Sequence, residues 1–407
     1  MRSLRTAFFI AYKSIVRGQK WTLVLMVLIL SLSFFNMMFT PGIFSGLMNT
    51  ITQLEINTAT SDISITPQQT PVPKQYIGNQ RELQARIQTI PGVIGTTRTY
   101  LTAASISYDK NKNGVYKTVS SQIIGITPSK AKKVLTIDKY IVAGKPLVNT
   151  DTNQILLSAA LAGGYNLPVP TDLGGVRVGD KVNIVYANGV SRKYTVKGIV
   201  KIIFGTALSD TYITTKEAES VLSTSNEASQ ILVKTDLNRA SLSYYKERIQ
   251  SLAPRLRVQM YTELLAALQS MLNAFTLIAF IVSMISVLVA TVTVFVMIYI
   301  NALDKRKQIG ILKAIGMKER IIVYSYMFQS IFYVLCGVGV GLLIVFFVAV
   351  PLLHHYPIQL PFGPLVVSFG SALTIKSVII FIIAGLFAGA IPARIVAREK
   401  ILDALWG

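Results

Sequence analysis

The chain has 407 residues, of which 52% are hydrophobic and only 14% are charged, and its formal net charge is +21. A soluble domain carries about 25% charged residues, so this composition excludes an ordinary soluble protein. The charge-poor stretches flank a middle part of ordinary composition, which indicates membrane segments around one folded domain.

Basic residues cluster before the first apolar run, between the second and third runs, and after the fourth. With four spans these three regions share one side, and the positive-inside rule makes that side the cytoplasm. We therefore expect a multi-pass protein of the cell (inner or plasma) membrane with both termini cytoplasmic, in contact with membrane lipids and not with nucleic acid. The basic residues are Arg2, Arg5, Lys13, Arg17, Lys20, Lys305, Arg306, Lys307, Lys313, Lys318, Arg320, Arg394, Arg398 and Lys400.

The lengths of the apolar runs predict the order of segments. No charged residue lies between Trp21 and Leu54 or between Leu264 and Leu303, whereas about 20 residues cross a bilayer. Both helices should therefore extend outside the membrane as stalks, with Pro41-Gly42 at the outer end of the first span or at a kink. The expected segments are an amphipathic cytoplasmic helix (1–20), a first span (21–44), an extracytoplasmic domain (45–265), a second span with an outer stalk (266–300), a cytoplasmic segment (301–320), a third span (321–350), an outer loop (351–373), a fourth span (374–396) and a cytoplasmic tail (397–407).

The extracytoplasmic part alternates between strand and helix patterns. The clearest hairpin joins Asp180–Tyr186 to Tyr194–Ile203 across Asn188-Gly189. This order predicts an α+β domain with a β-rich insertion at about 140–215. The only cysteine, Cys336, lies in the third span, so the outer domain has to be held by its own core.

Motifs for chemistry are missing from the sequence. It contains no phosphate-binding G-x-x-x-x-G-K-[ST] loop. The two histidines, His354 and His355, are neighbours without a third ligand, which rarely makes a metal site. The spans hold no carboxylate, which disfavours proton-coupled transport. We expect no catalytic residue, no metal and no cofactor of its own, so that energy for any transport comes from a partner.

The cytoplasmic segment RKQIGILKAIGMKER (306–320) predicts a short helix. On it Ile309, Leu312 and Ile315 can share one face with Lys313 opposite, while Gly310 and Gly316 allow tight turns or close approach. Either a partner groove covers this face or the segment is an ordinary connection. The pairs Gly337/Gly341 and Gly385/Gly389 are GxxxG motifs, which serve helix packing or reflect the abundance of glycine in membrane helices.

The cytoplasmic segment resembles the coupling-helix signature of MacB/FtsX-type ABC transporter permeases, a basic pair followed by E/Q-I-G-I-L-[RK]-A-[IL]-G. Gln308 stands where the family usually has Glu. The chain end is similar to the family's ending at Pro392, Ala393, Ala397 and Leu402–Leu405, with Asp403 in place of Glu. ILLSAALAG (155–163), VGDKVNIVY (178–186), YTVKGIV (194–200) and DTYITTKEAESVL (210–222) resemble its periplasmic module, so the likeness covers the whole chain.

The resemblance implies four transmembrane α-helices plus an α+β extracytoplasmic domain that is ferredoxin-like or porter-like with an inserted β-rich subdomain. It also implies a homo- or heterodimer, and an ABC-type ATPase subunit that binds ATP and docks under the coupling helix. Motion of long helices would then couple ATP hydrolysis to the outer domain, which is called mechanotransmission. The docking residues implied are Gln308, Ile309, Gly310, Leu312, Lys313, Ala314, Ile315, Gly316 and Met317.

Three functions follow from this sequence. The first is a permease subunit that exports or extracts a hydrophobic or periplasmic substrate (a drug, peptide, lipid or lipoprotein), with a periplasmic adaptor or lipoprotein as a further partner. The second is an FtsX-like signal transmitter that regulates a cell-wall hydrolase. The third is a membrane receptor or scaffold without an ATPase, which leaves the apolar face of 306–320 without a purpose. The size of the outer domain favours the first.

Overall fold

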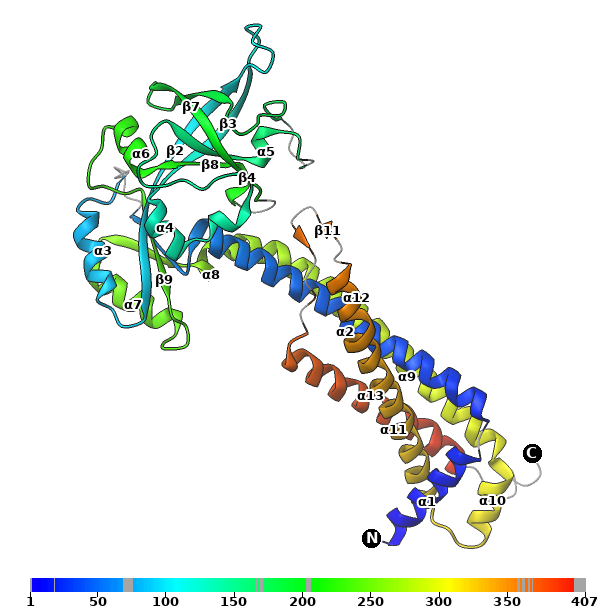
Figure 1. Cartoon of the computed structure of the whole chain (residues 1–407). Helices are drawn as coiled ribbons and strands as arrows, with labels where there is room; N and C mark the ends of the chain where they lie inside the picture. The colour runs from blue at the N-terminus through cyan, green and yellow to red at the C-terminus, as the bar shows by residue number, and fades with distance from the viewer. Residues whose placement is uncertain are drawn as a thin grey trace. The chain divides into compact units, whose positions relative to one another are not determined.

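A computed structural model describes residues 2–17, 19–68, 76–165, 167, 171–202, 206–356, 359–360, 363–364, 367 and 369–398. The chain divides into two compact units (Figure 1). The helical unit comprises Met1–Asn49, Met271–Ile358 and Leu365–Gly407, and the mixed unit comprises Thr50–Ser270 and Gln359–Pro364.

Helices that are long and apolar enough to cross a membrane number four in the described part of the chain, at Lys20–Thr60, Asn273–Asp304, Glu319–His355 and Ser371–Ala397. This confirms the expected four-helix membrane part. The elements are α1 (Arg2–Val16), α2 (Lys20–Glu55), α9 (Ala266–Asp304), α10 (Arg306–Ala314), α11 (Glu319–Leu343), a π-helical turn (Ile344–Ala349), α12 (Val350–His355) and α13 (Ser371–Ala397).

The helix of the first span continues through Pro41, which lies inside α2. The helix therefore does not end at Pro41-Gly42. A proline removes one backbone donor and leaves the carbonyl four residues earlier without its helical partner. Here the Ser283 hydroxyl of α9 donates to the Met37 carbonyl oxygen at 3.3 Å. Side chains of neighbouring helices commonly satisfy such freed groups in membranes. A contact that is distant in sequence thus supports α2 where its own ladder is broken.

The third helix also runs further than expected. We expected prolines to end it at about 350, but α12 continues to His355, with Pro351 in its first turn. Pro351 directly follows the π-helical turn Ile344–Ala349 within one span that runs from Glu319 to His355. Local π-helical adjustments can re-satisfy the backbone groups that a proline frees inside a membrane helix. The expected outer loop 351–373 therefore shortens to the residues between α12 and α13, and the part of it at 357–358, 361–362, 365–366 and 368 lies outside the described residues.

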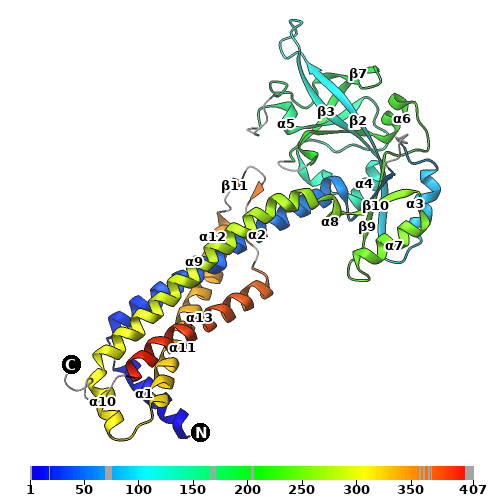
Figure 2. The ribbon, with the colours of Figure 1, turned by 180° about the vertical axis from the view of Figure 1, so that it is seen from behind.

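The helical unit packs around α11. Phe8 of α1 meets Phe328 of α11 edge to face at 5.8 Å between ring centroids, and Phe34 of α2 meets Phe381 of α13 at 5.3 Å. Helices α2 and α9 run side by side in both views (Figure 2), and Phe44 stacks on Phe275 between them.

The mixed unit is built on one ten-stranded sheet in the order β10-β1-β9-β2-β3-β8-β5-β7-β4, with β6 paired to β2 and β7. Its strands are β1 (Ile63–Pro67), β2 (Val93–Tyr108), β3 (Lys117–Ile126), β4 (Ile141–Gly144), β5 (Gln154–Ser158), β6 (Lys181–Tyr186), β7 (Ser191–Val200), β8 (Asp210–Thr214), β9 (Gln230–Thr235) and β10 (Leu256–Met260). Its helical elements are a π-helical turn (Ile56–Thr60), α3 (Gln80–Gln88), α4 (Pro128–Val134), α5 (Ala159–Ala162), α6 (Thr215–Leu222), α7 (Leu242–Leu252), α8 (Tyr261–Leu264) and 3-10 turns at Ile137–Tyr140 and Thr206–Ser209; β11 (Gln359–Leu360) and β12 (Gly363–Pro364) form a separate two-stranded ladder.

The four strands at one end of this sheet, β10, β1, β9 and β2, have the ferredoxin-like arrangement. The sequence β1-α3-β2 followed by β9-α7-β10 is a split β-α-β pair, and the spatial order β10-β1-β9-β2 is all antiparallel. Ile63, Ile87, Val233, Tyr245 and Ile249 form its buried core with α3 and α7. The expected ferredoxin-like α+β fold is therefore confirmed.

The insertion differs from the expected bounds of about 140–215. It begins after β2 and ends before β9, so it covers the chain between Tyr108 and Gln230. It is also continuous with the ferredoxin-like sheet, because β2 pairs with β9 through its first half and with β3 and β6 through its second half. The sequence could not place these ends, because a strand shared by two subdomains has no break in its alternation.

Candidate functional site

The cytoplasmic segment forms a short helix with well-defined ends. Lys305 has φ −100° and ψ 11°, which separates α10 from α9. At the other end the Gly316 amide donates to the Lys313 carbonyl and the Met317 amide to the Leu312 carbonyl, both at 3.0 Å. This pair of bonds is a Schellman motif, and Gly316 occupies its left-handed position with φ +93°. The sequence Leu-Lys-Ala-Ile-Gly-Met therefore ends the helix by its own chemistry.

One face of α10 is buried within the helical unit. Ile309 is only 5% exposed and belongs to a core cluster with Ile322 and Tyr326 of α11. Gly310 is also buried. The expectation that Ile309, Leu312 and Ile315 form one docking face is thus wrong for Ile309. A nine-residue helix without a partner is marginal in water, so it has to pack one side against its own unit.

The opposite face of α10 is exposed and apolar. Ile311 is 51% exposed, Ile315 is 79% exposed, and Ala314 between them is also exposed. Positions 311, 314 and 315 are neighbours on a helix surface. Polar or basic exposed residues border this face, namely Lys307, Gln308 and Lys318. Sequence reasoning missed Ile311, although the same helical spacing would have found it from a different starting residue.

Leu312 and Met317 occupy an intermediate position beside this face. Together with Ile315 and Thr6 of α1, they line an open concavity of about 500 Å³ at the turn that joins α10 to α11. Leu312 and Met317 are the residues whose apolar contact commonly accompanies a Schellman motif. The structure thus brings Leu312 and Ile315 together, as expected, and separates them from Ile309.

Lys313 ties α10 to two other helices. Its ammonium lies 2.9 Å from a Glu319 carboxylate oxygen in the first turn of α11, and it donates to the Ala397 carbonyl at 2.8 Å at the end of α13. Cations are favoured at a helix C-terminus, where backbone carbonyls carry partial negative charge. One side chain thus contacts both α11 and α13.

The four glycines of the GxxxG pairs lie where helices approach closely. A Cβ atom on Gly337 would lie 2.6 Å from the Leu30 Cβ, and one on Gly341 would lie 2.7 Å from the Phe34 ring, both on α2. The other two face α11: a Cβ on Gly385 would lie 2.3 Å from Val334, and one on Gly389 would lie 2.3 Å from the Ser330 hydroxyl. Helix α11 is therefore in tight contact with α2 on one side and α13 on the other.

Two buried carboxyl groups lie in the mixed unit where α2 ends. Glu55, the last residue of α2, is 1% exposed, and Asp210 at the start of β8 is 4% exposed. Burial, and secondly the charge of Glu55, raises the pKa of Asp210 to about 7. This pair was not expected from the sequence, because the two residues are distant along the chain and neither belongs to a motif.

Within the described ranges, no group of three or more His, Cys, Asp and Glu side chains lies close enough to hold a metal ion. The rings of His354 and His355 lie 6.0 Å apart at the end of α12. Of the residues that carry the resemblance at the chain end, Pro392, Ala393 and Ala397 are buried in α13, whereas Leu402–Leu405 lie outside the described residues.

Comparison with known proteins identifies both units. The family model "MacB-like periplasmic core domain" matches residues 23–252, and "FtsX-like permease C-terminal" matches residues 280–401. An uncharacterized ABC transporter permease of Methanocaldococcus jannaschii is 26% identical over 389 residues, which cover 89% of this chain and 88% of that protein.

Two solved structures match about half of this chain. The match to the extracellular domain of the noncanonic ABC-type transporter YknZ from Gram-positive bacteria covers 49% of this chain and 100% of the YknZ domain, with 12% identity and a TM-score of 0.34. The match to the periplasmic region of MacB from Actinobacillus actinomycetemcomitans covers 53% of this chain and 95% of the MacB region, with 10% identity and a TM-score of 0.38. The two family models together match most of the chain, and the chain therefore belongs to the family of MacB/FtsX-type ABC transporter permeases.

Proposed function

We propose that this permease works by mechanotransmission, in which a separate ATPase subunit binds and hydrolyses ATP and the permease passes the resulting motion to its outer domain. An ABC transporter permease implies an ATPase partner. The proposal rests on the continuity of α2 and α9, which have 36 and 39 residues. At a rise of about 1.5 Å per residue each is over 50 Å long, whereas a bilayer core is about 30 Å thick.

Chain continuity makes these two helices suitable levers. The last residues of α2, Thr50–Glu55, belong to the mixed unit, and so do the first residues of α9, Ala266–Ser270. Only one turn residue, Lys305, separates the other end of α9 from α10. Movement of α10 therefore reaches the mixed unit through backbone hydrogen bonds and not through a flexible linker.

The proposed ATPase-docking face is Ile311, Ala314 and Ile315 with its basic border. An exposed apolar stripe on a short helix is a typical anchor for a groove in a partner protein. The border of Lys307 and Lys318 predicts acidic residues at the rim of that groove. We propose that both termini are cytoplasmic, which an ATPase docked on α10 requires and the distribution of basic residues supports.

We propose a dimer of permeases, homo- or heteromeric, that exports or extracts a hydrophobic or periplasmic substrate such as a drug, peptide, lipid or lipoprotein. An adaptor or lipoprotein would join the outer domain. A chain that regulates a cell-wall hydrolase would instead recruit that hydrolase, so the proteins that bind the outer domain distinguish export from signalling.

The docking face is tested by capture of the ATPase in mild detergent. The double variant Ile311→Asp/Ile315→Asp should lose the ATPase, because two carboxylates would be buried in an apolar groove. Val115→Asp is a matched control, since Val115 is 69% exposed and lies in the mixed unit. Retention of the ATPase by the double variant would refute the docking face.

The lever is tested separately by an insertion of four glycines after Asn49 within α2. This should leave ATPase binding intact but uncouple ATP hydrolysis from motion of the outer domain, measured by distances between spin labels on β1 and β10 in the two permeases. The same insertion at Gly114, in an exposed hairpin turn of the mixed unit, is the control. Unchanged coupling after the α2 insertion would disprove the lever.

A further inference from the structure

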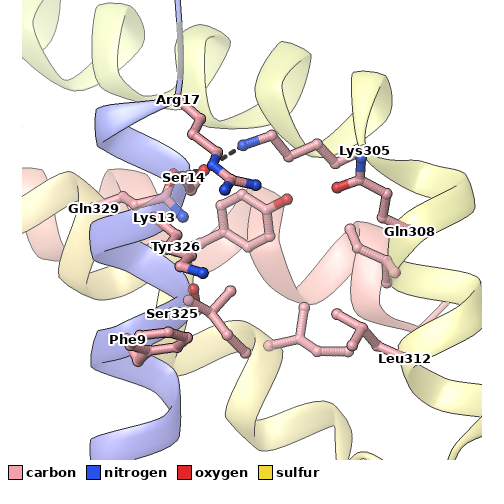
Figure 3. A pocket seen from close by; sticks show the side chains of 13 residues that line it. Phe9, Lys13, Ser14, Arg17, Lys305, Gln308, Leu312, Ser325, Tyr326 and Gln329 are labelled. Atoms are coloured by element: carbon pink, nitrogen blue, oxygen red, sulfur yellow. Dashed lines mark hydrogen bonds between the residues drawn. The ribbon is translucent and has the colours of Figure 1, made fainter.

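A cavity of about 380 Å³ lies among α1, α10 and α11 within the helical unit (Figure 3). This volume falls in the range of about 300–1,000 Å³ that is usual for small-molecule pockets. The cavity lies against the side of the candidate docking helix that carries Leu312 and the buried Ile309, and Ile311 and Ile315 are not among its lining residues.

The cavity carries an excess of positive charge. Lys13 and Arg17 of α1 and Lys305 at the α9–α10 turn all line it, and none of its described lining residues is an aspartate or a glutamate. Burial lowers the pKa of the Lys305 ammonium. That ammonium donates to the Ser14 hydroxyl, which donates in turn to the Gln329 side chain at 3.3 Å. Lys305 is thus held at the cavity wall by a chain of hydrogen bonds.

Hydroxyl groups from α11 complete the polar side. Ser325 is 2% exposed and lines the cavity, and its buried hydroxyl has no hydrogen-bond partner among the described residues. A buried hydroxyl without a partner is unfavourable unless something binds it. Figure 3 shows the Tyr326 hydroxyl directed into the space between Lys305 and Gln308. A bound oxyanion would satisfy the serine and neutralise the cations.

The remaining wall is apolar, which determines the kind of oxyanion. Phe9, Ile10, Leu312 and Ile322 line it beside the cations. Phe8 and Phe9 of α1 are 60% and 56% exposed, so α1 presents aromatic rings where the spans begin, as amphipathic helices at a membrane interface do. The polar lining comes from α1, from Lys305 and Gln308 at the start of α10, and from the second and third turns of α11.

We propose that this cavity binds the phosphodiester headgroup of one anionic phospholipid, with the phosphate held by Arg17, Lys305 and Ser325 and an acyl chain along Phe9. Its location in the cytoplasmic leaflet rests on the orientation proposed above. Because α10 and α11 share the cavity, an occupied site would fix the position of the coupling helix relative to the span that follows it.

The test is native mass spectrometry of the delipidated full chain titrated with phosphatidylglycerol or phosphatidylcholine. We expect one phosphatidylglycerol bound at least tenfold more tightly than phosphatidylcholine. Arg17→Gln/Lys305→Gln should abolish this preference. Arg5→Gln/Lys20→Gln, which removes the same charge from exposed positions outside the cavity, should preserve it. Equal loss in both double variants, or no preference in the original chain, would overturn the proposal.

Ser325→Ala keeps every charge and deletes only the unpartnered hydroxyl, so it tests the site even if the double variant fails to fold. It should weaken binding of phosphatidylglycerol about tenfold, as expected for one hydrogen bond to a charged group, without lowering thermal stability. Unchanged affinity would refute the assigned contact. Displacement of the lipid by millimolar inorganic phosphate would show a site for soluble anions and overturn the lipid assignment. No ATPase is needed, so failure here leaves the coupling proposal untouched.

Discussion

Replacement of Gly337 by alanine should separate α11 from α2. The added Cβ would lie 2.6 Å from the Leu30 Cβ and 3.4 Å from the Leu30 carbonyl carbon. Non-bonded carbon atoms prefer about 3.5–4.0 Å, so the helices would have to move apart by about 1 Å. Rotation of a side chain cannot relieve this overlap, because the Leu30 Cβ is fixed to its backbone.

Gly339 on the same helix supplies the matched control. A Cβ there would meet nothing within 4 Å. Both substitutions gain up to about 1 kcal/mol from the higher helix propensity of alanine, but only Gly337→Ala also incurs the ~1–3 kcal/mol typical of overpacking. We therefore expect Gly337→Ala to be the less stable of the two variants by about 1–3 kcal/mol.

The assay is a thermal melt read by a thiol-reactive dye. Cys336 is the only cysteine of the chain and lies half-buried on α11, so dye labelling reports opening of this helix. Gly337→Ala should melt several degrees below Gly339→Ala in the same detergent. If Gly337→Ala melted at or above the control, the close α2–α11 contact would not exist as described.

Further predictions concern the turn after α10 and the buried carboxyl pair. Gly316→Ala should weaken ATPase capture and destabilise the α10–α11 turn by about 1–2 kcal/mol, because φ is +93° there. Gly339→Ala, where a Cβ meets nothing within 4 Å, should neither weaken capture nor lower the melting temperature. The pKa of Asp210 is raised from 3.8 to about 7, so the folded state binds the extra proton and this group's contribution to stability falls as pH rises between those values. Asp210→Asn should therefore flatten the pH profile of the β-sheet circular dichroism melt and stabilise the chain at pH 8 by up to about 4 kcal/mol. The charge of Glu55 raises the pKa of Asp210, so Glu55→Gln should shift this decline in stability to lower pH. A shift to higher pH would contradict the assigned interaction.

Much of the membrane part could be predicted from the sequence. Runs without charge locate four spans because a charged side chain at mid-bilayer is costly, and this cost acts residue by residue without reference to the fold. The ends were less certain. Pro41 and Pro351 were expected near helix ends, but the hydroxyl of Ser283 supports the helix at Pro41, and a π-helical turn directly precedes Pro351. Local rules for proline could not anticipate a donor from a distant helix.

The candidate site shows the same division. The sequence by itself determined that a short amphipathic helix lies within 306–320, because apolar spacing and the Gly316 cap are local properties. Only the tertiary structure decided which side of that helix is free: Ile309 faces α11, and Ile311 and Ile315 remain exposed. It alone also brought Asp210 to Glu55 and Arg17 to Lys305, since burial and charge proximity depend on which distant segments meet, and no single segment encodes its partner.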